Sequence, residues 1–396
     1  MKVLLISSYL PYPLHSGGQV RLYNLIKQLA GEHEITLICE KRQHQTMQDI
    51  AEVEKICKEV ICIPRKKQWS IENIVKTGIS QKPFLITGHT LTQMQQIIVE
   101  VLNKKKFDLI HVETFYVAQN LPKTDLPIVL VEHNIEYLIY QRFMDKAPLA
   151  LKPLLLLDIK KLKKAEEDCW KRANHVVAVS QEEKKVIDKF NSFVSVVPNG
   201  VDLGKFKVKD LTKKSKEKKI LFIGDFSYIQ NRDATQFIIR EVAPILRKIM
   251  KDVNLKFWFV GRRIPQTTKD LANSSDIVFD DQNPSSTEEI FSAADVLLSP
   301  IRMGAGTQYK ILEAMAVGTP VVTTKLGNEG VNAIDNKEIL VADKAEEIAE
   351  KVKLILENDK LYKTIALNAR KLIEERFDWE TIAEKLERVY ETVVKK

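Results

Sequence analysis

A predicted helix start at Gln308 carries the side chains of this sequence that are best suited to chemistry. Gly304 and Gly306 precede it, and Lys310 and Glu313 lie in the first turns of the helix. Backbone N–H groups at a helix N-terminus attract phosphate, and glycines let a phosphate approach the backbone closely. Lys310 would add a positive charge, and Glu313 would accept hydrogen bonds from a ribose diol. The spacing predicts a site for a nucleoside diphosphate.

The same two charged side chains have a simpler interpretation. Lys310 and Glu313 are also spaced as an ion pair on a helix surface, which would contribute only a few tenths of a kcal/mol to helix stability. Local spacing alone does not decide between the two. The flanking pattern predicts a strand, a turn, a helix and a second strand: Asp295–Pro300, a turn in which Thr307 adds a hydroxyl donor, Gln308–Val317 with Gly318 as its C-cap, and Pro320–Thr324.

Short apolar runs alternate with helical periodicity along the whole chain, which is the pattern of parallel sheets covered by helices on both faces. The pattern restarts after Val197–Asp202, where turn residues precede a lysine-rich stretch. We therefore expect an α/β protein of two doubly wound, Rossmann-like domains that face each other across a cleft, with the active site between them. The predicted strands are Val3–Ser8, Ile35–Cys39, Val60–Ile63, Leu109–Val112, Ile128–Val131, Val176–Val179, Val194–Val197, Ile220–Ile223, Leu255–Val260, Ile277–Phe279, Val296–Leu298, Val321–Thr323 and Ile339–Val341.

The composition fits an enzyme of two domains. A chain of 396 residues exceeds the length at which one core usually stops growing, and 44% hydrophobic residues can fill two cores. The four cysteines have no Cys-x-x-Cys spacing, which indicates a reducing compartment and no structural zinc. The apolar start Met1–Ser8 indicates a first strand rather than a signal peptide, and no run is long enough to span a membrane. We expect a cytoplasmic protein.

Lysines give the chain a formal net charge of +8. Nucleic acid is not the expected partner, because aromatic residues are not interleaved with the lysine clusters and no nucleic-acid-binding signature is present. One segment, Leu149–Lys164, combines leucines with lysines. It fits either an ordinary packed helix or a helix on an anionic membrane surface, and the second alternative would hold the protein peripherally at the inner face of the membrane.

Three motifs in this order resemble the family-4 retaining glycosyltransferases of the GT-B fold, and the resemblance covers nearly the whole chain. They are Pro11-x-Pro13 with Gly17-Gly18 and Arg21, then Val197-Pro-Asn-Gly-Val-Asp202, then Leu312-Glu-Ala-Met-Ala-x-Gly-x-Pro-Val-Val322 followed by Gly327 and Glu329-Gly330. Within the family the chain is similar to bacterial sugar transferases of exopolysaccharide and cell-surface glycan assembly. The shared pattern is Gly224, Tyr228 and Asn231, then Pro300-x-Arg302 and Gly304-x-Gly-Thr-x-x-Lys310.

The resemblance implies transfer of a hexose-type sugar from a nucleoside-diphosphate sugar to a hydroxyl of a glycan or lipid-linked acceptor, with the anomeric configuration kept. Glu313 matches the glutamate that holds the nucleotide ribose. Lys310, with Arg302, would neutralise the leaving diphosphate. Asn199 of the mid-chain motif is assigned to the same donor site. The segment that meets the donor sugar and phosphates is Gly304, Ala305, Gly306, Thr307 and Gln308.

In the first domain, Gly17 and Gly18 match the loop that closes over the phosphates, and a tight turn after the first strand is the alternative for this pair. The family commonly has a histidine near the end of the strand that His133 follows, and it contacts the donor sugar. The resemblance therefore implies that His133 is catalytic, with Lys310 and Glu313, while a satisfied polar group at a strand end is its alternative. His111 and Glu113 are weaker candidates for the acceptor side.

Two positions depart from the family pattern. Many members have a second glutamate eight residues before the one that Glu313 matches, where this chain has Ala305, so another group must contact the donor sugar. Many also have an arginine after the glycine that ends the first strand of the second domain, whereas Asp225 follows Gly224 here. The candidates to replace that arginine are Lys310, Arg302 and Arg262.

The resemblance implies an acceptor-side domain at residues 1–200, a donor-binding domain at 201–376, and a terminal helix at 377–396 that crosses back to the first domain. No Asp-x-Asp triplet or histidine–carboxylate cluster indicates a metal site, so we expect metal-independent transfer without a cofactor.

Other functions fit parts of the pattern. A sugar-nucleotide epimerase or a phosphorylase of this fold would share the cleft, and Ala305 is compatible with a catalytically impaired subunit that supports a partner. A dinucleotide oxidoreductase fits least, since no Gly-x-Gly-x-x-Gly follows a strand.

Overall fold

The computed structural model describes residues 1–65, 67–145, 147–212, 215–272, 274–283, 285–303 and 306–395. The chain divides into two compact units. The first unit comprises Met1–Pro198 and Ile382–Lys396, and the second unit comprises Asn199–Thr381. Each unit contains one parallel sheet with helices between its strands, so the doubly wound α/β architecture predicted from the sequence is confirmed.

The described part of the first unit has a seven-stranded sheet in the order β3-β2-β1-β4-β5-β6-β7, in which every pairing is parallel. Its strands are β1 (Lys2–Ser7), β2 (Glu34–Lys41), β3 (Glu59–Pro64), β4 (Leu109–Glu113), β5 (Ile128–Val131), β6 (His175–Ala178) and β7 (Val194–Val196). Its helices are α1 (Gly17–Leu29), α2 (Met47–Glu54), α3 (Ile71–Ile79), α4 (Phe84–His89), α5 (Thr92–Lys104), η1 (Phe115–Asn120), α6 (Glu136–Asp145), η2 (Leu149–Leu151), α7 (Lys152–Arg172) and α8 (Gln181–Ile187).

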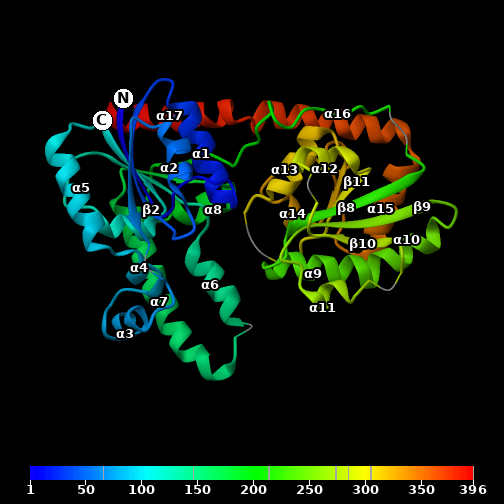
Figure 1. Ribbon diagram of the computed structural model, residues 1–396, viewed down its shortest axis with the longest axis horizontal. Helices are drawn as coiled ribbons and strands as arrows, with labels where there is room; N and C mark the ends of the chain where they lie inside the picture. Colours follow the sequence, from blue (N-terminus) through cyan, green and yellow to red (C-terminus); the bar gives the residue numbers. More distant parts are fainter. Residues whose placement is uncertain are drawn as a thin grey trace. The chain divides into compact units, whose positions relative to one another are not determined.

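The core of the first unit follows from the alternation of side chains along its strands. Leu4 and Ile6 of β1 point to the face that α5 and α7 cover, and they share a cluster there with Met94 and Trp170. Figure 1 shows α5, α4 and α7 along this unit, with α1 and α2 near its other side. The inner strands β2, β1, β4, β5 and β6 are buried on both faces, which explains their runs of Val, Ile and Leu.

The second unit has a six-stranded sheet in the order β10-β9-β8-β11-β12-β13 in its described part, again with parallel pairing. Its strands are β8 (Glu217–Asp225), β9 (Asn254–Arg262), β10 (Ile277–Asp280), β11 (Val296–Ser299), β12 (Val321–Thr323) and β13 (Leu340–Val341). The helices from this point to the chain end are α9 (Ile229–Phe237), η3 (Ile238–Val242), α10 (Ala243–Ile249), α11 (Gln266–Lys269), α12 (Thr287–Ala293), α13 (Tyr309–Val317), α14 (Lys325–Asn328), α15 (Ala345–Glu357), α16 (Asp359–Arg376) and α17 (Trp379–Val394).

Two hydrophobic clusters fill the second unit, one on each face of the sheet. One joins the sheet to α9, η3, α10 and α15, and the other joins it to α12, α13 and α16. Figure 1 shows α9 and α12 on opposite sides of this sheet. This arrangement leaves the carboxyl ends of β8, β9, β11 and β12 at one edge, where Gly224, Arg262 and Thr324 lie.

The helix predicted after the glycine-rich turn is confirmed. Gln308 is its N-cap, and Gly318 ends it in the left-handed conformation with φ 80°. The terminal helix begins at Trp379 rather than Phe377, because the N–H of Phe377 still bonds to the carbonyl of Ile373 and closes α16. Residues of α17 from Ile382 on belong to the first unit.

No described helix is both long enough and apolar enough to cross a membrane. The segment Leu149–Lys164 forms η2 and the first part of α7. The four cysteines are free thiols.

Candidate functional site

The turn before α13 is held close to the chain that follows α14. Gly306 has the left-handed φ of 81°, and a Cβ added to Gly330 would lie 2.6 Å from Cα of Thr307. The side chain of Gln308, the N-cap of α13, makes no cap hydrogen bond. Gly304 and Ala305 lie outside the described residues.

The amine of Lys310, the predicted phosphate ligand, lies at the carboxyl end of β8, beside Gly224. Its Nζ donates to Oδ1 of Asn231 over 2.8 Å and lies 4.4 Å above the ring centroid of Phe222. A Cβ at Gly224 would be only 3.1 Å from this Nζ, so glycine there makes room for the amine. Burial lowers the pKa of Lys310 to about 7. The amine is therefore poised to gain charge when an anion arrives.

Asn231 fixes the position of Lys310. While its oxygen accepts from Lys310, its amide nitrogen donates to the backbone carbonyl of Asp225 over 2.8 Å. The sequence analysis quoted Asn231 only as part of a pattern and gave it no role. The family pattern was the signal that pointed to this residue, but the pairing with Lys310 joins side chains 79 positions apart.

Glu313 lies one turn further along α13 and is half-buried. Burial raises the pKa of its carboxyl group to about 7, although the charges of Lys205 and Lys310 oppose the shift. Lys205 in turn pairs with Glu288 of α12 over 3.5 Å. The sequence alone does not point to Lys205 and Glu288, because no motif connects them to α13.

The two candidate arginines of the second unit already pair with carboxylates. Arg302 makes a two-pronged contact to Asp233, at 3.0 and 2.9 Å, and its guanidinium lies 4.2 Å above the ring of Phe237. Arg262 lies 3.8 Å from Asp225. Of the three cations considered as replacements for the absent arginine, Lys310 is the one that the structure places against Gly224.

Asp225 itself is held by an arginine that the sequence analysis did not consider. Burial opposes ionisation of Asp225, but hydrogen bonds from Arg263 and Ser227 outweigh it and lower the pKa of the carboxyl group to about 2. Arg263 reaches this carboxylate from a left-handed backbone with φ 58°. This backbone conformation has no sequence signal, since glycine is the residue that favours it.

In the first unit, a buried glutamate joins two histidines at the carboxyl ends of β4 and β5. Oε2 of Glu113 lies 2.7 Å from Nε2 of His111, and Oε1 forms a short hydrogen bond with Nε2 of His133. Burial opposes ionisation, but the two histidines outweigh it and hold the pKa of Glu113 far below its usual range. The hydroxyl of Tyr390 lies 2.5 Å from Nδ1 of His111. No sequence motif pointed to this histidine–carboxylate cluster, because Glu113 ends one strand and His133 follows another.

This cluster does not have the form of a metal site. Both carboxylate oxygens of Glu113 are engaged by imidazole nitrogens, and no group of three or more His, Cys, Asp or Glu side chains among the described residues is arranged to hold a metal ion. The cluster instead fixes the orientation of His133, whose side chain is 18% exposed. No described residue bonds to Nδ1 of His133, which leaves one ring nitrogen for a ligand.

The predicted glycine pair lies beside His133. Gly17 and Gly18 begin α1, and a Cβ on Gly18 would lie 3.3 Å from Cε1 of His133 and 3.0 Å from the hydroxyl oxygen of Tyr9. Arg21 on the same helix is fully buried and donates to the carbonyls of Val197 and Pro198, at 2.8 and 2.7 Å. Arg21 thus ties α1 to the mid-chain motif, which is a structural role. Asn199 is the first residue of the second unit.

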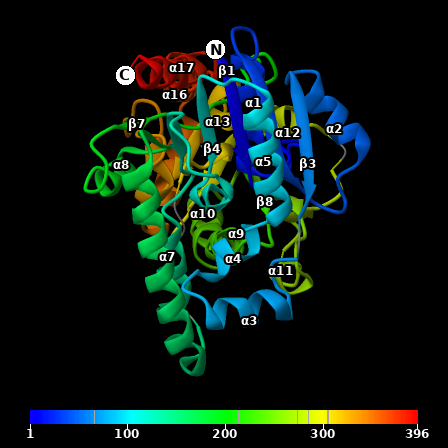
Figure 2. The same cartoon turned by 90° about the vertical axis from the view of Figure 1, so that its left-hand side faces the viewer.

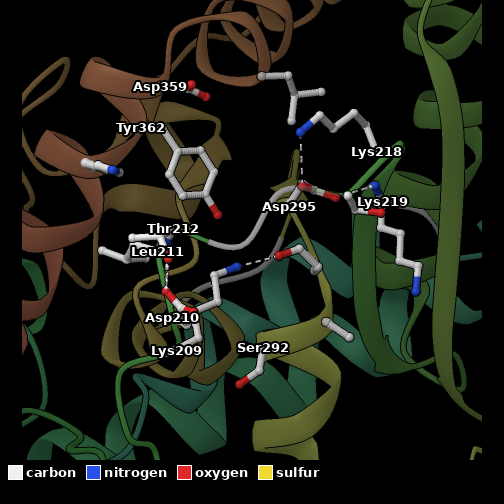
Figure 3. A pocket seen from close by; sticks show the side chains of 15 residues that line it. Lys209, Asp210, Leu211, Thr212, Lys218, Lys219, Ser292, Asp295, Asp359 and Tyr362 are labelled. Atoms are coloured by element: carbon white, nitrogen blue, oxygen red, sulfur yellow. Dashed lines mark hydrogen bonds and ion pairs between the residues drawn. The ribbon is translucent and has the colours of Figure 1, made fainter.

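A hollow of the second unit lies at the other edge of its sheet. It has a volume of about 590 Å³ and lies at the amino ends of β8 and β11. Figure 3 shows Lys218 paired with Asp295 and Lys209 turned toward a backbone carbonyl, which is that of Ala294 at 2.5 Å. It contains none of the predicted site residues, and ligands of doubly wound sheets bind at the carboxyl ends instead.

In comparisons with known proteins, both units match family models of glycosyltransferases. Residues 15–205 match the family model described as Glycosyltransferase Family 4, and residues 217–358 match the model described as Glycosyl transferases group 1. An uncharacterised 44.6 kDa protein of the cps region of Klebsiella pneumoniae is 22% identical over 391 residues, which cover 95% of this chain and 96% of that protein. The capsular polysaccharide biosynthesis glycosyltransferase CapM of Staphylococcus aureus is 26% identical over 212 residues, 50% of this chain and 54% of CapM.

Two solved structures have the same fold over their whole length. Sucrose-phosphate synthase of Thermosynechococcus elongatus has a TM-score of 0.73 at 16% identity and 100% coverage of both chains. HepE of Anabaena, in complex with UDP and glucose, has a TM-score of 0.65 at 14% identity, with 99% of this chain and 100% of HepE covered. The two family models together span most of the chain, and this protein belongs to the family-4 glycosyltransferases and has the GT-B fold.

Proposed function

We propose that this protein is a retaining hexosyltransferase that moves a sugar from a nucleoside-diphosphate donor to a hydroxyl of a glycan or lipid-linked acceptor, in exopolysaccharide or cell-surface glycan assembly. One observation carries the proposal. Lys310 is a half-buried amine, held by Asn231 against Gly224, in the first turn of a helix whose N-cap side chain makes no cap hydrogen bond. An amine placed in this way is better suited to binding a diphosphate than to forming an ion pair with Glu313 on the helix surface.

The charge on Lys310 would follow the reaction. A bound diphosphate favours the protonated amine and raises its pKa above the value of about 7 in the free protein. Negative charge grows on the diphosphate as the sugar leaves, so Lys310 and the N–H groups of α13 would stabilise the transition state more than the bound donor. Gly306, Thr307 and Gln308 bring the backbone to the phosphates and sugar.

Glu313 would hold the ribose. An ionised carboxylate accepts hydrogen bonds from both hydroxyls of a diol, and the neighbouring Lys205 and Lys310 favour that ionised form. Arg262 lies at the same sheet edge beside Asp225 and would supply further positive charge to the donor site, while Arg302 would act there only after leaving Asp233.

His133 would contact the donor sugar through Nδ1 and a sugar hydroxyl, because Nε2 is engaged by Glu113. Glu113 is a poor nucleophile, since it is fully buried and both of its oxygens bond to histidines. Retention would then proceed by attack of the acceptor on the same face as the leaving diphosphate, which takes the acceptor proton. Gly17 and Gly18 would allow close approach of the phosphates to the start of α1.

The relatives support the donor and the pathway. HepE binds UDP and glucose, and CapM is named for capsular polysaccharide biosynthesis. The relative that matches this chain over nearly its full length lies in a cps region. We extend these properties to this chain as part of the proposal, together with a cytoplasmic location at the inner face of the membrane.

We propose further that transfer needs neither a metal ion nor a cofactor. Lys310 and the α13 N-terminus would supply the positive charge that a divalent cation supplies elsewhere. Chelation by EDTA is expected to leave turnover unchanged, and loss of turnover that Mg²⁺ or Mn²⁺ restores would contradict this part.

Product formation from a panel of uridine, guanosine and adenosine diphosphate sugars, with a glycan and lipid acceptor extract, tests the function. Mass spectrometry follows the product, and NMR of its anomeric signal reports retention. Glu313→Ala is expected to abolish turnover, whereas Glu350→Ala, an exposed glutamate of α15, should not. Nucleotide binding without turnover in the wild type would instead favour the impaired partner subunit. Turnover without an acceptor would favour an epimerase.

A further inference from the structure

Half of the large hydrophobic side chains that are exposed in the described chain lie in two short segments of the first unit. Eleven of twenty-two fall within residues 69–79 and 143–157. Soluble proteins scatter such side chains, so a concentration of them marks a binding surface. They are Trp69, Ile71, Ile74, Val75, Ile79, Phe143, Leu149, Leu151, Leu154, Leu156 and Leu157, with exposures from 42% at Leu156 to 84% at Ile79. We name these residues the α3–α7 surface.

The two segments are fastened to each other. Nζ of Lys161 on α7 donates to the carbonyls of Thr77 and Ser80 at the end of α3, over 3.0 and 2.8 Å. Asp158 of α7 accepts from the N–H of Phe84, over 2.8 Å, at the start of α4. Figures 1 and 2 both show α3 beside α7 at one end of this unit. Because these hydrogen bonds hold α3 and α7 together, we treat their exposed apolar side chains as one surface.

Positive charge predominates in the segments that form this surface. Residues 65–82 and 143–164 contain eleven lysines and arginines against three acidic residues, Glu72, Asp145 and Asp158. Of these three, Glu72 pairs with Lys76 over 2.5 Å, and Asp158 is used in the contact with Phe84. A surface of apolar side chains bordered by lysines complements a layer with an apolar interior and anionic headgroups.

We propose that the α3–α7 surface binds the face of an anionic lipid bilayer. A second copy of the chain fits it less well, because two such surfaces would bring like charges together. The residues between 69 and 79 lie outside the leucine–lysine segment that the sequence indicated. They add Trp69 to the surface, and tryptophan is suited to a membrane interface.

The position of the surface in the first unit connects it to the acceptor. α3 follows the carboxyl end of β3, and α6 and α7 follow the carboxyl end of β5, the sheet edge at which Glu113 and His133 lie. This connection rests on the proposed function. Bilayer contact at this edge would give an acceptor carried on a membrane lipid a short path to the site, so the inference narrows the acceptor class to lipid-linked glycans.

Vesicle flotation with the full-length protein tests the inference. We expect binding to phosphatidylcholine vesicles that contain phosphatidylglycerol, weakened by high salt, and little binding to phosphatidylcholine alone. The pair Ile71→Ser with Ile79→Ser and the pair Leu154→Ser with Leu157→Ser should each lower the partition coefficient about tenfold or more. The matched pair Leu354→Ser with Leu367→Ser, exposed leucines of the second unit, should leave it unchanged.

Several outcomes would overturn the inference. They are absence of wild-type binding to anionic vesicles, equal binding by all three pairs, and a solution dimer that both first-unit pairs dissociate, which would assign the surface to a second copy. Unfolding temperatures check that the variants fold. Donor turnover without vesicles is measured in parallel, so vesicle binding without turnover would reject the proposed function and keep the surface, and turnover without vesicle binding would do the reverse.

Discussion

At the scale of a single residue, the protonation of Lys310 is linked to nucleotide binding. Its pKa of about 7 in the free protein means that a diphosphate binding above neutral pH must also take up a proton. A bound anion raises this pKa, so affinity is present in full below pH 7 and falls as pH rises, by up to about tenfold per pH unit. We expect calorimetric titration with UDP, or the nucleotide of the active donor, to show this decline between pH 7 and 9.

Two variants of Lys310 separate charge from hydrogen bonding. Lys310→Met should weaken nucleotide binding by about 1.5–3 kcal/mol at pH 7, roughly ten- to hundredfold, and remove the decline at higher pH. Lys310→Arg keeps a charge that does not titrate there, so its affinity should not depend on pH in this range. A decline that persists in Lys310→Met would assign the titration to another group.

At the scale of elements, close contact between Gly330 and the backbone of Thr307 positions the turn before α13. A Cβ at Gly330 would meet Cα, N and Oγ1 of Thr307 at 2.6, 2.9 and 2.9 Å. Gly330→Ala should therefore cost about 1–3 kcal/mol and lower the unfolding temperature by several degrees, about 2–4 °C per kcal/mol. Because this turn precedes the helix start, nucleotide affinity should fall as well. Gly78→Ala is the control, since nothing lies within 4 Å of that Cβ, and scanning calorimetry that ranks the two alike would contradict the assignment.

The strands and the end of α13 were predictable because their sequence signals are local. Most side-chain contacts within the site were not predictable. Thirteen apolar runs predicted the thirteen strands of the described chain, and Gly318 predicted the end of α13. No local signal brings Asn231 to Lys310, or Glu113 to both His111 and His133. These contacts depend on strand order, which places residues far apart in sequence at one sheet edge.

At the scale of the whole molecule, the residues proposed to bind the donor are distributed over two units, each of which folds around its own core. Hydrogen exchange can assign the part of the donor that each unit binds. The nucleoside diphosphate alone should protect the turn before α13 and the segment after β8 in the second unit, because Lys310, Glu313 and Asn231 lie there.

The complete sugar nucleotide should add protection in the first unit at the start of α1 and around His133, since those residues are proposed to meet the sugar and phosphates. Gly18→Ala, whose Cβ would lie 3.3 Å from the His133 ring, should reduce this added protection and leave that of the second unit intact. Protection confined to the second unit with the complete donor would remove His133, Gly17 and Gly18 from the donor site. Glu113 and the two histidines would then be a structural cluster or part of the acceptor site, as the burial of Glu113 and His111 and the ionised carboxylate also allow.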